Sequence, residues 1–178
     1  MTETIRAARV EDAAGIARVH VDTWRTTYKG IVPEEYLANL SYEQSEHMWA
    51  RGLSNPAREP FYSVAENDQG QIVGFVVGGP ERRHDVEYPA ELYAIYILEE
   101  YQGRGLGRRL THELVKSLLG AGMNAMLVWV LAENPFRRFY EALGGQYVRT
   151  EQFELGGAML DEVAYGWRDI RTLLKRSE

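Results

Sequence analysis

The chain has 178 residues, no cysteine and a formal net charge of −6 at pH 7, a size that suits a single domain over residues 1–178. The acidic charge argues against a nucleic-acid partner held by a generally basic surface, and the lack of cysteine excludes disulfides, thiolate metal sites and a cysteine acyl-enzyme. No apolar run is long enough to span a bilayer and no signal peptide is recognisable, so we expect a cytoplasmic protein without a membrane partner.

The first third of the chain predicts one strand followed by three helices. Apolar residues recur near the 3.6-residue period after the first strand, and Pro33 and Ser41 suit the starts of the next two helices. The expected strand covers residues 4–10, and the expected helices cover residues 11–28, 33–40 and 41–53.

The remainder predicts strands that alternate with two helices. The strongest strand, residues 90–98, is apolar on both faces, as expected of a central strand. Asn134 and Gly144 suit the start and the end of the second helix. In chain order we expect a hairpin over 61–67 and 72–79, a polar loop over 81–89, the strand 90–98, a helix over 105–119, a strand over 125–132, a helix over 134–145 and a hairpin over 146–155 and 161–167. The fold is therefore expected to be mixed α/β around one central sheet.

The stretch EEYQGRGLGRR, residues 99–109, combines three glycines with three arginines where a helix is expected to begin. A helix N-terminus presents unpaired N–H groups and partial positive charge, and glycines allow close approach of a ligand. An anionic guest, most often a phosphate, explains both features. The alternative is a solvated face in which Arg109 pairs with Glu113. The spacing fits neither a P-loop nor a dinucleotide fingerprint.

Three ordered motifs resemble the GCN5-related N-acetyltransferase (GNAT) superfamily. QGRGLG, residues 102–107, resembles its Q/R-x-x-G-x-G/A signature, and NPFRRFYEALGGQYV resembles its second cofactor motif. VHVDTWRTTYKGIVPEEYL resembles the first two helices of bacterial members. The resemblance implies a mostly antiparallel sheet flanked by helices, in which the parallel strands 91–98 and 125–132 splay apart. It also implies acetyl transfer from acetyl-CoA, as cosubstrate, to a primary amine.

The resemblance assigns cofactor contacts to specific positions. Backbone N–H groups of the glycine turn hold the pyrophosphate, strand backbone pairs with the pantetheine arm, Asn134 bonds an amide of that arm, and Tyr140 protonates the leaving thiolate. The implied cofactor-binding residues are Ile95, Tyr96, Ile97, Gln102, Gly103, Arg104, Gly105, Leu106, Gly107, Arg108, Asn134 and Tyr140.

The reaction also needs a base, because an alkylamine with a pKa of about 10 is mostly protonated at neutral pH. Glu91, at the start of the central strand, is the candidate base, with Glu87 a weaker one and water with backbone carbonyls the alternative. The N–H of Ile97 is the expected oxyanion donor. For Tyr140 the alternative is a core position, because it forms a helical stripe with neighbouring apolar residues.

The acceptor is expected to contact Trp24, Tyr28 and Glu91, although Trp24 and Tyr28 also suit a core. Further candidates for an acidic, aromatic mouth are Asp22, Glu34, Glu35 and Tyr36. The four histidines lack metal-ligand spacing, so no metal is expected. The partner is a small-molecule or peptide amine. The alternatives are protein lysines or N-termini as acceptors, or a non-catalytic acyl-CoA-binding module. Exposed end strands also favour a homodimer.

Overall fold

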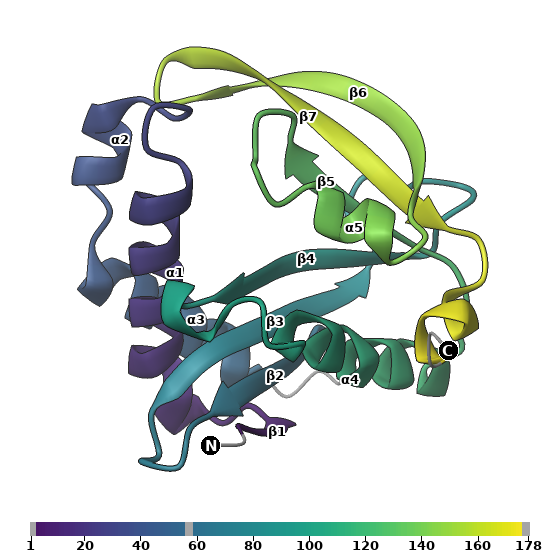
Figure 1. The fold of residues 1–178 in the computed structure, drawn as a ribbon, viewed down its shortest axis with the longest axis horizontal. Coiled ribbons are helices and arrows are strands. Elements are labelled where there is room, and N and C mark those ends of the chain that lie inside the picture. The colour runs from purple at the N-terminus through teal and green to yellow at the C-terminus, as the bar shows by residue number, and fades with distance from the viewer. Residues whose placement is uncertain (1–2, 56–58, 176–178) are drawn as a thin grey trace.

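The computed structural model describes residues 3–55 and 59–175 as an open seven-stranded sheet with helices on both faces (Figure 1). The strand order is β1-β2-β3-β4-β5-β7-β6, and every neighbouring pair is antiparallel except β4 and β5. The strands are β1 (Thr4–Ala7), β2 (Phe61–Glu66), β3 (Ile72–Pro80), β4 (Ala90–Ile97), β5 (Met126–Leu131), β6 (Gln146–Leu155) and β7 (Ala158–Trp167). The expected mixed, mostly antiparallel sheet is confirmed. The single domain over 1–178 stays a prediction, and residues 1–2, 56–58 and 176–178 lie outside the described part.

The helices cover the sheet on opposite sides. The helix α1 packs on β3 and β4 together with α3, whereas α4 packs against β2, β3 and β4 from the other face (Figure 1). The expected apolar stripe of α4 is confirmed, because Leu106, Leu110, Leu114 and Leu118 are all buried. The helices are α1 (Ala13–Thr27), α2 (Glu34–Ala38), α3 (Tyr42–Leu53), α4 (Leu106–Gly120) and α5 (Arg138–Ala142).

The parallel strands β4 and β5 separate toward their C-terminal ends, as expected. They pair only over Ala90–Leu92 and Met126–Val128, although β4 continues to Ile97. The strand β4 has a bulge where the separation begins. Consecutive residues of β3 pair with Leu92 and with Ala94, so Tyr93 is the extra residue. Such a bulge bends the strand and redirects its side chains. The result is a crevice between the two strands.

Three of the expected elements have boundaries that are wrong by three residues or more. The helix expected over 134–145 is only α5, because the Oδ1 of Asn134 accepts the N–H of Phe136 at 2.8 Å and stabilises a turn before it. Asn134 is therefore not the N-cap of that helix. The first strand ends at Ala7, and β7 begins at Ala158, immediately after the turn at Gly156 and Gly157.

Candidate active site

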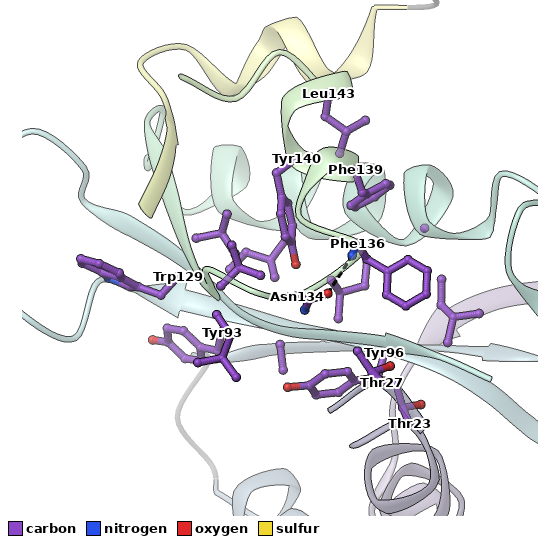
Figure 2. A pocket seen from close by; sticks show the side chains of 18 of the residues that line it. Thr23, Thr27, Tyr93, Tyr96, Trp129, Asn134, Phe136, Phe139, Tyr140 and Leu143 are labelled. Carbon is purple, nitrogen blue, oxygen red and sulfur yellow. Dashed lines mark hydrogen bonds between the residues drawn. The ribbon is translucent and has the colours of Figure 1, made fainter. Parts of the chain in front are cut away.

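A cavity of about 730 Å³ opens where β4 and β5 separate. This volume is in the range of small-ligand and cofactor sites. Figure 2 shows Tyr140 and Tyr96 projecting from opposite walls toward its middle, with Trp129 and Tyr93 at one end and Phe136 and Thr27 at the other. Of the implied cofactor-binding residues and the main acceptor candidates, all but Arg104 line it: Trp24, Tyr28, Glu91, Ile95, Tyr96, Ile97, Gln102, Gly103, Gly105, Leu106, Gly107, Arg108, Asn134 and Tyr140.

The glycine turn has the backbone of an anion cradle. Gly103 and Gly105 have φ angles of 71° and 78°, and no atom lies within 4 Å of the position a Cβ would take at either residue. Gly105 is the N-cap of α4, so unpaired N–H groups of the first turn face the space that the glycines leave open. The Nε2 of Gln102 donates to the carbonyl of Ile97 at 2.9 Å and fixes the turn to the end of β4.

The arginines of this stretch have different positions. Arg108 lines the cavity, but Arg104 does not, and its guanidinium lies 5.5 Å from the ring centre of Tyr101. The alternative pairing of Arg109 with Glu113 is wrong. Arg109 donates to the carbonyl of Glu3 at 2.6 Å, because it faces the N-terminal segment, while Glu113 binds Lys116. The positive charge of the turn is thus divided between the cavity and the surface.

The free edge of β4 exposes backbone polar groups to the crevice. In an antiparallel pair the backbone groups of successive residues alternate in direction. Because the N–H of Leu98 bonds to β3, the alternation turns the N–H and C=O of Ile97 and Ile95 toward the crevice. The backbone of Tyr96 faces β3 instead, so Tyr96 lines the cavity through its side chain. Two residues, rather than three, are therefore placed to pair with an extended ligand.

Three tyrosines meet at the middle of the cavity, of which Tyr28 is buried and Tyr96 and Tyr140 are partly buried. Burial raises the pKa of Tyr28, Tyr96 and Tyr140 above the ordinary phenol value, so each remains a protonated donor at neutral pH. The hydroxyl of Tyr28 accepts the side-chain N–H of Asn134 at 3.1 Å. This bond joins α1 to the turn before α5. No hydrogen bond within the described residues uses the Tyr140 hydroxyl, which points into the cavity (Figure 2).

Glu91 lies in the cavity wall with both carboxylate oxygens occupied. Its side chain is buried, and Arg82 donates to Oε1 from Nη2 at 2.5 Å and to Oε2 from Nε at 3.1 Å. The guanidinium of Arg82 also lies 4.2 Å from the ring centre of Tyr93. From the sequence we expect the loop 81–89 on the substrate side, but only Glu87 is named as a candidate in it, so Arg82 is missed. The run of Arg82 and Arg83 before a predicted central strand was the available signal.

The expected acceptor mouth is only partly assembled. Trp24 and Tyr28 line the cavity with ring centres 4.6 Å apart, and they also pack into a small apolar cluster. The weaker base candidate Glu87 forms an ion pair with Arg168 and is not part of the lining. Four further candidates do not line the cavity: Asp22, Glu34, Glu35 and Tyr36.

Among the described residues, no group of three or more potential ligands is arranged for a metal ion. His20, on α1, bonds through Nδ1 to the hydroxyl of Ser45 at 2.9 Å and stacks on Tyr96 with ring centres 5.6 Å apart. Burial lowers the pKa of His20 to about 4. No helix in the described part of the chain has both the length and the apolar character needed to cross a membrane.

The sheet is open, and its cavity lies between two parallel strands that separate next to a glycine-rich helix N-terminus. Enzymes with open α/β sheets commonly bind their ligands at such a place. The model of the acetyltransferase (GNAT) family matches residues 16–145, which is more than half of the chain. The chain therefore belongs to the GNAT family, and the resemblance found in the sequence is confirmed.

Individual relatives agree with this family. The uncharacterized N-acetyltransferase YuaI of Bacillus subtilis is 43% identical over 177 residues, covering 97% of this chain and 99% of that protein. The ribosomal protein bS18-alanine N-acetyltransferase of Haemophilus influenzae is 31% identical over 105 residues, covering 57% of this chain and 68% of that protein.

Solved structures show the same fold. YncA of Salmonella typhimurium, solved with acetyl-CoA, has a TM-score of 0.69 at 22% identity, covering 94% of each chain. PaiA of Thermoplasma acidophilum, solved with coenzyme A, has a TM-score of 0.66 at 24% identity, covering 91% of this chain and 98% of that one. The predicted acyltransferase class and the acetyl-CoA cosubstrate are confirmed at the level of the family. The acceptor is not determined by any of these likenesses.

Proposed function

We propose that the protein transfers the acetyl group of acetyl-CoA to a primary amine of a small molecule or peptide by direct attack in a ternary complex. The observation that carries the proposal is the continuity of one cavity from the glycine turn, past the free edge of β4, to the hydroxyl of Tyr140. The residues fit the cosubstrate. Gly103 and Gly105 leave room for a diphosphate, and Ile95 and Ile97 offer backbone groups to an extended amide-containing arm.

Tyr140 is the proposed general acid. Its phenol is partly buried, is protonated at neutral pH and can donate to the sulfur of the departing thiolate. The N–H of Ile97 faces the crevice and is the proposed donor to the oxyanion that forms at the thioester carbonyl. Asn134 is proposed to position the arm, since its amide bonds Tyr28 and the turn before α5 while it lines the same cavity.

Glu91 is the proposed base. Because Arg82 bonds both of its oxygens, Glu91 accepts a proton only when Arg82 shifts or when a water molecule in the cavity relays the proton. Replacing Glu91 by glutamine tests this role. Loss of the acidic limb of the pH–rate profile, with the affinity for acetyl-CoA unchanged, supports the proposal. An unchanged profile assigns the task to water and backbone carbonyls.

Protein N-termini are a second candidate acceptor, favoured by the likeness to the ribosomal protein bS18-alanine N-acetyltransferase. Thiol release from acetyl-CoA, measured across a panel of small amines and short peptides, separates the two candidates from each other. A protein that binds acetyl-CoA but releases no thiol with any amine or with a cell lysate would instead be the non-catalytic acyl-CoA-binding module.

We also propose that the protein forms a homodimer and that it is located in the cytoplasm. The strand β6 ends the sheet and leaves an edge available to a second copy, with Tyr147 exposed beside it. A homodimer through this edge is refuted if light scattering gives a species of monomer mass. A cytoplasmic location is expected of the chain and is tested by fractionation of the native host.

A further inference from the structure

Among the described residues, two carboxylates line the cavity, Glu91 and Glu162, and their hydrogen bonding differs. Arg82 occupies both oxygens of Glu91. Glu162 uses only Oε1, which accepts from Nη2 of Arg83 at 2.5 Å. Its Oε2 accepts no hydrogen bond from the described residues, and it is not sealed from solvent. Glu162 therefore has one oxygen available to a ligand.

The position of Glu162 is fixed by the surrounding strands. It lies on β7 opposite Leu131 of β5, and the residue is only 8% exposed. The alternation of β7 places it on the same face as Ala164, which pairs with Trp129. Arg83 lies 4.3 Å from the ring centre of Trp129. The ion pair therefore orients Glu162 before any ligand arrives.

The charged groups around this end of the cavity have an acidic balance. Arg83 bridges Glu162 and Glu151, and neighbouring ion pairs and N–H bonds join the remaining members. The members are the carboxylates Glu81, Asp85, Glu91, Glu151 and Glu162 and the guanidiniums Arg82, Arg83 and Arg149. The four members that line the cavity, Glu91, Glu162, Arg82 and Arg83, balance in charge. The members behind them carry three negative charges against one positive, so the network as a whole has two negative charges in excess and favours a cation over an anion.

We infer that the acceptor carries two basic groups, the amine that reacts and a second group that stays positively charged when the reacting nitrogen is neutral. Glu162 binds this second group through Oε2. The inference rests on the proposed function, since it names the acceptor of the same cavity. The reacting amine has to lose its proton before attack, so the ammonium group held by Glu162 is a different one. Glu162 is thus a specificity-determining residue and not the base.

Three probes of equal chain length isolate the charge at the far end: 1,4-diaminobutane, butylamine and 4-aminobutyrate. Their binding is measured by calorimetry on the protein saturated with CoA. We expect 1,4-diaminobutane to bind at least about tenfold more tightly than butylamine, and 4-aminobutyrate to bind weakest, because a charge-assisted bond to Glu162 distinguishes them. Equal affinities, or a preference for 4-aminobutyrate, would overturn the inference.

The variant Glu162→Gln keeps the shape of the side chain and removes its charge. It is expected to lower the affinity for 1,4-diaminobutane about tenfold while that for butylamine stays within about twofold. Glu151→Gln is the matched control, because it removes the exposed partner of Arg83 and leaves both oxygens of Glu162. An unchanged preference in Glu162→Gln contradicts the inference. Failure of the wild-type protein to bind CoA would instead count against the proposed function. Titrations of the three amines on the CoA-free protein would still decide the role of Glu162.

Discussion

The two ends of the cavity are constructed differently. The glycine end, where we propose that the diphosphate binds, comes from the contiguous segment 102–108 and offers backbone groups whose geometry Gly103 and Gly105 permit. The end where we propose that the acceptor binds comes from side chains far apart in the chain, and Arg83 reaches Glu162 across 79 positions. The comparison shows why the reaction class is evident from the sequence and the acceptor is not. A local backbone site has a sequence motif, whereas a site assembled by strand pairing has none.

The largest effect is expected at the glycine end. Gly105→Glu forces a side chain into a backbone with φ of 78° and brings a negative charge to the anion site. We expect the dissociation constant for acetyl-CoA to rise by at least about 100-fold, which calorimetry measures directly. Gly122→Glu is the matched control, since Gly122 has φ of 83°, open space around it and a position beyond the C-terminal end of the same helix. Equal loss of binding in both variants would show that strain, rather than charge at the site, is responsible.

The next effect is expected at the middle of the cavity. Tyr140→Phe removes the proposed proton donor, so kcat should fall at least about 100-fold while the affinity for acetyl-CoA stays within about twofold. Tyr165→Phe is the control, because Tyr165 stacks on Tyr140 but bonds Glu141 outside the cavity. Normal turnover by Tyr140→Phe would remove Tyr140 from the mechanism and leave it as a core residue.

A smaller effect is expected for the ion pair of Arg82 and Glu91 in the cavity wall. Arg82→Met leaves the carboxylate of Glu91 buried without its partner and should lower the free energy of unfolding by about 2 kcal/mol. Adding Glu91→Gln should restore most of that loss, and denaturant unfolding of the two single variants and the double variant measures the coupling. Additive losses would mean that the two side chains do not stabilise each other.

The last effect concerns pH and does not appear at neutral pH. The pKa of His20 is about 4 in the folded protein and about 6.5 when unfolded, so the unfolded state takes up the proton first. The stabilisation is complete above pH 6.5 and is lost as the pH falls toward 4, amounting to at most about 3 kcal/mol. His20→Gln should flatten this pH dependence in urea unfolding. Identical slopes for the variant and the wild-type protein would refute the role of His20.

Much of the fold could be predicted from the sequence because its signals are local. The leucine stripe of α4, the glycine turn and the long apolar strand β4 each follow from a periodicity or a composition within a short segment. The short length of α5 could not be predicted from its punctuation, since the Asn134 side chain stabilises a turn instead of capping the helix. The proline that follows Asn134 is compatible both with a turn and with the first residue of a helix, so it does not distinguish them.

The acceptor side of the site could not be predicted for a different reason. Glu162 lies in a strand with an ordinary pattern, and only the pairing of β7 with β5 brings it to the cavity beside Trp129. Arg82 and Arg83 lie in a polar loop whose fold depends on bonds to Glu81, Glu91 and Glu162. Such side-chain contacts across long separations leave no periodic signal in a single sequence.

The most direct test of the central claim compares acetyl-CoA with S-acetylpantetheine, which carries the same thioester and arm but lacks the diphosphate and the adenosine 3′-phosphate joined to it. Calorimetric titration of the wild-type protein with each ligand separates the contribution of the glycine turn from that of β4. We predict that acetyl-CoA binds at least about 100-fold more tightly than S-acetylpantetheine, because the diphosphate is held by the N–H groups of the turn. Equal affinity for the two ligands, or no binding of acetyl-CoA by the folded protein, would contradict the account.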